Sequence, residues 1–285
     1  MPDDWRLLHT GPADGPTNMA IDQAIMEAVI RRQVPPTLRF YGWQPPCLSL
    51  GRFQPVTVVN QEECRARGYD LVRRPTGGRA ILHDEELTYA LVVPQHDPRF
   101  RDHRDVLASY RAISTALVRG LERLGVMAQL TPAYEHPVPP ATAACFDQPA
   151  DYEITVGGRK LVGSAQARRG GVILQHGTVL LDVDLDALVA VLCPPVGITP
   201  GAFRERLAAR LTSLRQVVGR PVAFAEVAAA LAEGFQQTFA VRLVSDELSA
   251  TERQRAERLR RAKYAAGDWT NRYPGTGCSS SSPRH

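Results

Sequence analysis

The chain has 285 residues, of which 44% are hydrophobic and 22% charged, with a formal net charge of +4. This composition is typical of a globular protein, and the length suits one large domain with a small addition, or two domains. The five cysteines form no C-x-x-C pair and no zinc-finger spacing, so we expect no metal site. The N-terminus "MPDDWRLLHTGPADG" lacks the features of a signal peptide, and no apolar run approaches the ~18 residues of a membrane helix. We therefore expect a cytoplasmic protein with free thiols and no membrane contact.

The excess positive charge lies in one stretch. Residues 252–263, "ERQRAERLRRAK", hold six basic and two acidic residues, so this stretch alone carries the net charge of the chain. No basic stripe runs through the remainder, which gives nucleic-acid binding little support. Two interpretations stay open, namely a solvated helix face and a docking surface for an acidic protein partner.

Apolar periodicity, cap residues and turn residues place the elements of the first half. Cap-type Thr17 and Asn18 begin a helix with one apolar face, and a strongly amphipathic helix ends near Gly125. The predicted helices are 17–32, 60–68 and 105–125, and the predicted strands are 37–43, 47–52, 69–72 and 87–93.

The second half begins with a long loop. Residues 131–150 are rich in proline and alanine, and long loops inside compact domains are often functional. Strands are predicted at 151–158, 159–169 and 171–184, and the remainder is mainly helical. Hairpin-like strands with helices before, between and after them predict an α+β fold. We expect a mixed, mainly antiparallel sheet with helices packed on one side.

The connection between strands 69–72 and 87–93, "RRPTGGRAILHDEE", is far longer than a hairpin turn requires. Gly77 and Gly78 allow backbone amides to approach a ligand, and the arginines supply positive charge. This composition is typical of a loop that binds a phosphate, carboxylate or carbonyl, although a solvated turn has a similar makeup.

Two further residues are candidates for chemistry. Cys145 lies in the long loop directly before a strand, whereas a structural cysteine usually lies inside an apolar periodic segment. Lys160 lies on strand 159–169, where strict alternation places it on the same face as Val162 and Ser164. That face could point into a cleft, although most lysines on strands are solvated.

The same strand and its successor contain small and polar residues. Gly163 and Ser164 are small enough for an extended ligand to lie across the sheet. His176 and Gly177 interrupt the apolar run "GVILQHGTVLL". We expect His176 to be a buried, hydrogen-bonded histidine rather than a catalytic base.

Three of these segments, "RRPTGGRAILHDEELTYAL", "GRKLVGSAQARRGGVILQHGTVLLDVD" and "KYAAGDWT", together with a helix beginning "NMAIDQA", resemble the lipoate and octanoate attachment family, which is related to biotin ligases. The resemblance runs from about residue 5 to residue 273. It implies a biotin/lipoate protein ligase-like catalytic fold, which we place at residues 1–248. Charge and composition predict a basic helical extension at 249–273 and a disordered tail at 274–285.

Two departures point to one branch of this family. The ATP-using lipoate ligases carry a third glycine where this chain has Arg79, and they lack a catalytic thiol where it has Cys145. Both departures resemble the octanoyl-[acyl carrier protein]:protein N-octanoyltransferases of the LipM type, which use a cysteine acyl-thioester and no nucleotide. The resemblance therefore implies a monomer without cofactor. Its implied partners are octanoyl-acyl carrier protein and a lipoyl-domain protein such as the glycine-cleavage H protein.

The resemblance also implies roles for individual residues. Cys145 would carry the octanoyl group, and the Lys160 ammonium would lower the thiol pKa and polarise the thioester carbonyl. We expect Lys160→Ala to abolish transfer with little loss of folding stability. The implied substrate-binding residues are Arg73, Gly77, Gly78, Arg79, His83, Gly163, Ser164, Ala165, His176 and Gly177. Arg79 either fills the nucleotide space or reaches the phosphopantetheine, and the oxyanion donors could come from the Gly77–Gly78 or the Gly163–Ser164 backbone.

Several alternatives remain. An ATP-dependent lipoate ligase would form an adenylate from free lipoate, and an octanoyl amidotransferase would move the acyl group between lipoyl proteins. A non-catalytic carrier-binding protein would not need Cys145. Nucleic-acid binding through the basic stretch would show a steep dependence on salt.

Overall fold

The computed structural model describes residues 4–100, 105–131 and 153–274. The strands are β1 (Asp4–Ala13), β2 (Thr37–Trp43), β3 (Cys47–Leu50), β4 (Asp70–Arg73), β5 (Ile81–His83), β6 (Glu86–Pro94), β7 (Gln129–Leu130), β8 (Ile154–Val156), β9 (Arg159–Arg169), β10 (Val172–Leu180) and β11 (Arg242–Asp246). The α-helices are α1 (Gly15–Ile30), α2 (Gln61–Ala66), α3 (Val106–Glu122), α4 (Leu185–Val191), α5 (Pro200–Arg210), α6 (Leu214–Val218), α7 (Phe224–Phe239), α8 (Ala250–Leu259) and α9 (Gly267–Thr270). Short 3₁₀ turns lie at Val56–Val58 and Pro98–Phe100, and a π-helical turn at Arg260–Tyr264 continues α8.

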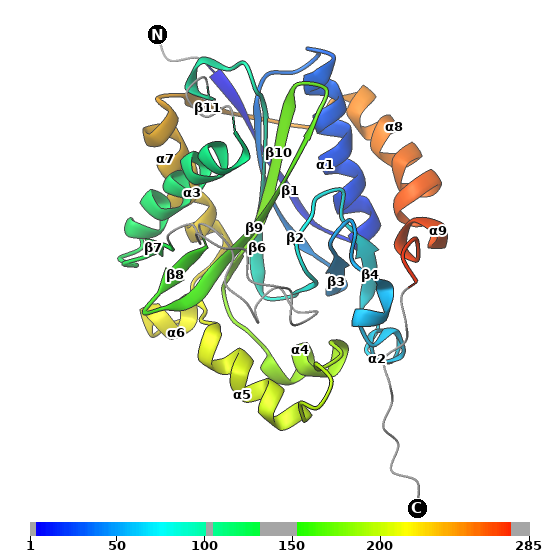
Figure 1. Cartoon of the computed structure of the whole chain (residues 1–285). Helices are drawn as coiled ribbons and strands as arrows, with labels where there is room; N and C mark the ends of the chain where they lie inside the picture. The colour runs from blue at the N-terminus through cyan, green and yellow to red at the C-terminus, as the bar shows by residue number, and fades with distance from the viewer. Residues whose placement is uncertain (1–3, 101–104, 132–152, 275–285) are drawn as a thin grey trace, which may run out of the picture.

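Eight strands form the main sheet in the order β11-β1-β2-β6-β10-β9-β8-β7. The pairs β11–β1 and β1–β2 are parallel, and the other five pairs are antiparallel. The central strands cross the middle of the molecule in Figure 1. The prediction of an α+β fold with a mixed, mainly antiparallel sheet is confirmed.

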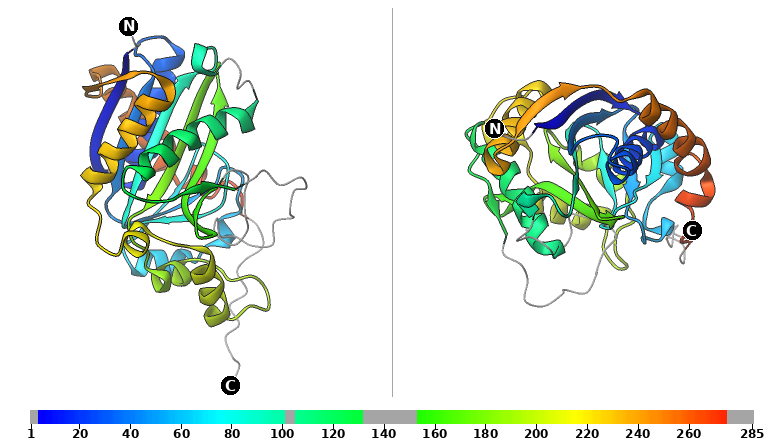
Figure 2. Two further views of the ribbon diagram at one scale, coloured as in Figure 1. Left: turned by 90° about the vertical axis from the view of Figure 1, so that its left-hand side faces the viewer. Right: turned by 90° about the horizontal axis from the view of Figure 1, so that it is seen from above.

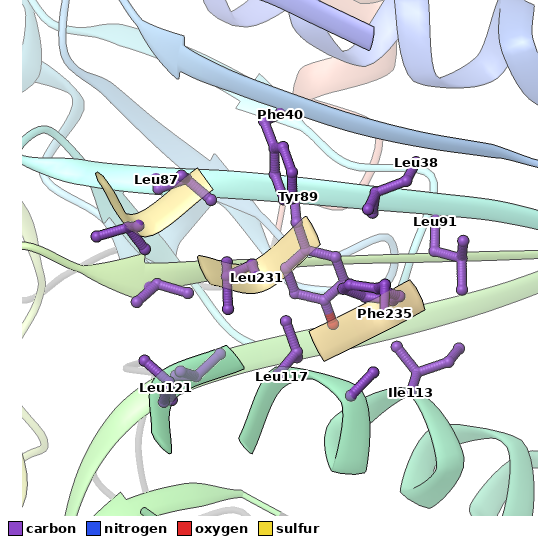
Figure 3. Packing of buried hydrophobic residues seen from close by; sticks show 14 of the residues in the cluster. Leu38, Phe40, Leu87, Tyr89, Leu91, Ile113, Leu117, Leu121, Leu231 and Phe235 are labelled. Atoms are coloured by element: carbon purple, nitrogen blue, oxygen red, sulfur yellow. The ribbon is translucent and has the colours of Figure 1, made fainter. Parts of the chain in front are cut away.

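Helices cover both faces of this sheet, not one as the sequence suggested (Figure 2). On one face α3 and α7 close a large apolar cluster, part of which Figure 3 shows around Tyr89 and Phe235. On the other face α1 and α8 enclose a second cluster around Met19 and Tyr264. The central strands have an apolar residue on each face, since Leu91 belongs to the first cluster and Ala90 to the second.

Glycines set the approach of α3 to α7. A Cβ on Gly234 would lie 2.3 Å from the Ala116 carbonyl oxygen, and one on Gly120 would lie 2.7 Å from the Leu231 Cα. The two backbones therefore touch at a point where no larger residue fits. Asp105 begins α3 as its N-cap by accepting a hydrogen bond from the Ala108 N–H.

A smaller sheet, in the order β4-β3-β5, packs with α2, α4 and α5 around a third apolar cluster. In Figure 1, β3 and β4 lie to the lower right of the central strands, close to the lower end of α1. The connection from β4 to β5 carries the glycine pair, so the small sheet presents that loop to β9 and β10 of the main sheet. No helix of the described residues is long and apolar enough to cross a membrane.

Candidate active site

The face of β9 that carries Lys160 is set by a β-bulge. Ile154 of β8 pairs with Val162, while the next residue, Thr155, pairs with Lys160, so Leu161 is an extra residue on β9. Leu161 and Val162 both enter the apolar core, and this inverts the alternation of the strand. Lys160 therefore shares its face with Gly163, and the predicted grouping with Val162 and Ser164 is wrong.

The bulge turns Lys160 inward. Its side chain is buried, and the ammonium donates a short hydrogen bond to the equally buried carboxylate of Glu153. A Cβ on Gly163 would lie 3.1 Å from the Lys160 Cε, so the lysine stem crosses the strand where a side chain is missing. Of the two orientations that the sequence left open for Lys160, the structure shows the inward one.

A narrow cavity lies directly beyond Gly163, between the main sheet and the connection from β4 to β5. Its walls combine apolar groups with small residues and a few polar ones. The lining residues are Met19, Tyr41, Trp43, Arg74, Ile81, His83, Thr88, Gly163, Ser164, Ala165, His176, Gly177 and Thr178. Six of the residues proposed from the sequence, from β5, β9 and β10, thus meet in one place.

The glycine loop lies beside this cavity without Gly77 or Gly78 lining it, and hydrogen bonds hold its backbone. Arg74 donates to the carbonyl oxygens of Gly77 at 3.1 Å and Arg79 at 2.8 Å. Gly78 has a positive φ of 85°, and a Cβ there would lie 3.7 Å from the Ala165 Cβ on β9. Gly51 approaches Gly78 so closely that a Cβ on Gly51 would overlap the Gly78 carbonyl oxygen. Because Gly51 and Gly78 both lack a side chain, their backbones can touch beside the cavity.

Arg73 has another role than the sequence suggested. Its guanidinium donates to the carbonyl oxygens of Thr270 at 2.7 Å and Gln54 at 2.6 Å, and it is completely buried. It therefore ties the C-terminal segment to the turn after β3 and does not line the cavity. Arg79 is half-buried and lies outside the cavity lining, so both roles proposed for it stay predictions.

His176 is buried within a hydrogen-bonded chain, as expected. The Asp22 carboxylate lies 2.9 Å from its Nδ1, and the Thr76 hydroxyl lies 2.6 Å from its Nε2. Since a carboxylate only accepts, Nδ1 carries the proton and Nε2 accepts from Thr76. Burial lowers the pKa of His176, although Asp22 opposes the shift, so the ring is neutral and not a strong base. This chain connects β10 to the glycine loop through Thr76.

Asp22 is charged despite complete burial. Burial alone would raise the pKa of Asp22, but the Arg39 guanidinium and the His176 N–H outweigh it and hold that pKa below its usual value. Tyr41 adds a hydrogen bond of 2.9 Å from its hydroxyl. The wall of the cavity is therefore fixed by a fully paired polar network.

His83 forms a second chain of the same type on the opposite wall. Its Nε2 lies 2.6 Å from the Ser49 hydroxyl, its Nδ1 lies 2.7 Å from the Glu86 carboxylate, and its ring stacks on Trp43 at 4.0 Å. Arg74 also donates to the Ser49 hydroxyl at 2.6 Å. All of these groups are buried, so His83 is held rigidly as part of the wall.

The structure describes three of the five cysteines, namely Cys47, Cys64 and Cys193. Cys145 lies outside the described residues, so its predicted role rests on the sequence. Cys47 and Cys64 are free and buried, and burial raises the pKa of Cys47 well above its usual value and that of Cys64 to about 11. Neither is a reactive thiolate at neutral pH. Cys193 is disulfide-bonded, which differs from the expectation of free thiols.

Four of the six basic residues between 252 and 263 form ion pairs within the chain. Arg258 and Lys263 form no ion pair with any of the residues that the structure describes. The pairs are Arg253–Glu247 at 3.9 Å, Arg255–Glu27 at 2.6 Å, Arg260–Asp14 at 2.7 Å and Arg261–Glu257 at 2.5 Å. Two of these pairs bind the helix to α1 and its N-cap, so this charge mainly attaches α8 to the domain.

The sequence analysis missed several residues of this site. Asp22 was detectable as a lone acid among the apolar residues of "AIDQAIM", a pattern that favours a buried, paired carboxylate. Glu153 gave no such signal, because its partnership with Lys160 depends on the bulge. Trp43 resembled an ordinary core residue.

Comparisons with known proteins agree with this geometry. Residues 14–236 match the family model described as the lipoyl protein ligase A/B catalytic domain. A protein of Kyrpidia tusciae named octanoyltransferase LipM is 50% identical over 273 residues, which cover 94% of this chain and 98% of that protein. A protein of Symbiobacterium thermophilum with the same name is 45% identical and is covered completely, with 95% of this chain aligned.

Solved structures give the same picture. A bipartite lipoate protein ligase of Thermoplasma acidophilum, solved in a study that includes its E2 lipoyl domain, superposes with a TM-score of 0.77 at 26% identity, covering 94% of this chain and 96% of that one. A lipoate-protein ligase A bound with ATP superposes with a TM-score of 0.74 at 28% identity, covering 95% and 99%. The match over residues 14–236 covers more than half of the chain, which therefore belongs to the lipoyl protein ligase A/B catalytic domain family.

Proposed function

We propose that this protein is an octanoyltransferase of lipoate biosynthesis. It takes an octanoyl group from octanoyl-acyl carrier protein and transfers it, through a thioester on Cys145, to a lysine of a lipoyl-domain protein such as the glycine-cleavage H protein. The relatives named octanoyltransferase, at up to 50% identity over nearly the whole chain, support the acyl group. The observation that carries the proposal is the narrow slot lined by Gly163, together with the buried Lys160 ammonium, which would lie 3.4 Å from a Cβ at that glycine.

The reaction has two balanced steps. The Cys145 thiolate attacks the thioester carbonyl, the octanoyl–Cys145 bond forms, and the carrier leaves as a thiol after taking a proton. The neutral amine of the acceptor lysine then attacks octanoyl–Cys145. An amide forms, and the proton lost by the amine returns to the Cys145 sulfur. Exchange between thioesters is nearly balanced and amide formation from a thioester is downhill, so the cycle needs no ATP.

Lys160 supports both steps from within the protein. An ammonium ~4 Å from a thiolate at an effective dielectric of ~20 would contribute at most ~4 kcal/mol. Because Glu153 partly neutralises this charge, the attraction between Lys160 and the thiolate is smaller than this upper limit. We propose that the positive charge of the Lys160 ammonium also polarises the thioester carbonyl.

The test is an acylation assay without nucleotide. Purified protein is mixed with octanoyl-acyl carrier protein, its intact mass is measured, and the modified peptide is mapped. We expect a gain of one octanoyl group on Cys145 and none in Cys145→Ser. Cys47 and Cys64 serve as internal controls, because burial raises the pKa of both thiols.

Each competing function gives a different result in this assay. An ATP-dependent lipoate ligase would stay unmodified until ATP and free lipoate are added. An octanoyl amidotransferase would be acylated by octanoyl-H protein and not by the acyl carrier protein. A carrier-binding protein would bind the donor without any change in mass.

A further inference from the structure

A compact group of cations and aromatic rings lies beside the glycine loop. We call it the cationic patch and define it as Arg52, Phe53, Lys263, Arg272 and Tyr273. Two distant segments build it, because the Phe53 and Tyr273 rings lie 6.1 Å apart and the Val56 N–H donates to the Tyr273 carbonyl at 2.8 Å. Arg52 and Arg272 are exposed, and Phe53 is 67% exposed, which is unusual for a phenylalanine.

The cations of the patch lack acidic partners in the described part of the chain. No carboxylate there lies within 4.0 Å of Arg52, Lys263 or Arg272, whereas Arg255 and Arg260 of the neighbouring helix are both paired. The guanidinium groups instead lie near aromatic rings, with Arg272 5.5 Å from the Trp269 ring centre and Arg52 5.3 Å from that of Phe53.

The positive field of the patch acts on Lys263. Burial, and after it the charges of Arg52, Arg169 and Arg272, lower the pKa of Lys263 to about 8. Its ammonium lies 4.0 Å from the Trp269 ring centre and donates to Gln23 at 2.8 Å. Three further cations therefore act on one lysine, and an approaching anion would relieve this repulsion.

The patch adjoins the glycine loop but does not line the cavity. The Arg52 N–H donates to the Thr76 carbonyl at 2.8 Å, and Gly51 contacts Gly78 directly. Arg73 connects the two segments, with its guanidinium on the carbonyls of Gly51 and Thr270. A molecule bound to the patch would therefore lie next to the glycine loop.

We propose that the cationic patch docks the acidic carrier protein that delivers the octanoyl group. This inference rests on the proposed function. Unpaired cations around an exposed phenylalanine match a partner with an acidic surface and a small apolar area. Residues 252–263 as a whole fit this role less well, since most of their charges are paired within the chain.

The donor fits this position better than the acceptor does. A carrier holds its acyl group on a long flexible arm, so the carrier can dock beside the cavity while the arm enters it. An acceptor lysine reaches only the length of its own side chain, so a lipoyl domain must sit directly over the cavity. Because no residue of the patch lines the cavity, its geometry favours the donor.

The experiment compares two donors in the full-length protein. Arg52→Glu and Arg272→Glu are each measured with octanoyl-acyl carrier protein and with octanoyl-pantetheine, a thioester without the protein part. Arg258→Glu is the matched control, because Arg258 is exposed on α8 and forms no ion pair in the described structure. Steering by charge raises association rates by about 10- to 1,000-fold, so we expect KM for the carrier to rise about tenfold or more at low salt in each patch variant.

The outcomes are distinct. With octanoyl-pantetheine both patch variants should have the KM of wild type. Arg258→Glu should match wild type with both donors. Added salt should reduce the difference in carrier KM between the patch variants and wild type. An unchanged KM for the carrier, or a rise only for the lipoyl-domain acceptor, overturns the donor assignment. If wild type accepts neither donor, the proposed function fails and the docking proposal fails with it.

Discussion

Replacing Lys160 should destabilise the fold as well as stop the chemistry. Lys160 is the only side-chain partner of the Glu153 carboxylate in the described structure, and both are about 95% buried. Lys160→Met leaves that carboxylate without its partner, and removing one member of a buried pair costs about 3–5 kcal/mol. We therefore expect the free energy of unfolding to fall by about 3–5 kcal/mol at pH 7.

The expectation that Lys160→Ala causes little loss of folding stability is revised accordingly, because it assumed a solvated strand face.

Urea unfolding followed by tryptophan fluorescence at pH 7 measures this loss. The matched variants are Glu153→Met and the double variant Lys160→Met/Glu153→Met. Replacing a buried pair by apolar residues is often nearly neutral, so the double variant should lie within about 1 kcal/mol of wild type. A stable double variant without transfer activity separates the chemical role of Lys160 from its structural one. If Lys160→Met loses less than about 1 kcal/mol at pH 7, the reasoning from burial is refuted.

Three further predictions follow from the same region. Gly177→Ala would place a Cβ 2.5 Å from the Gly163 carbonyl oxygen, so we expect urea unfolding to show a loss of about 3 kcal/mol in the free energy of unfolding. A urea midpoint equal to that of wild type would contradict this geometry. Burial lowers the pKa of His176, so the stability that the neutral ring contributes to the fold is fully present above about pH 6.5 and is lost as pH falls. The unfolding free energy of His176→Gln should therefore depend less on pH between 7 and 5 than that of wild type. Arg73→Met removes charged donors from buried carbonyls, so we expect a loss of about 2–3 kcal/mol and faster proteolysis at 265–274, and equal cleavage rates would disprove the anchoring role.

Local patterns predicted the elements that local interactions determine. The apolar spacing of 105–125 placed α3 correctly, and β9 matches the predicted strand 159–169. His176 was identified as a buried histidine because it interrupts an apolar run. In each case the deciding contacts lie within a few residues or on one face of one element.

Long-range contacts explain what was missed. The strand β1 was not predicted, because "DWRLLHTGPA" has no clear alternation and is stabilised by pairing with β2 and β11. The bulge at Leu161 depends on how β8 pairs with β9, so a strict alternation gave the wrong face for Lys160. The acids Asp22 and Glu153 find their partners only after the sheet has formed.

The position of β1 has a consequence for synthesis of the protein. Arg6 on this first strand is buried against Glu252, which lies 246 positions later in the chain. A ribosome adding about 5–20 residues per second needs about 12–50 s to span that distance. During this time Arg6 has no carboxylate partner at Glu252, and the edge of β1 that later pairs with β11 is open to other strands. The nascent chain is therefore a candidate for chaperone binding until α8 emerges, and variants that weaken the Arg6–Glu252 pair should show their largest effect on yield rather than on the activity of folded protein.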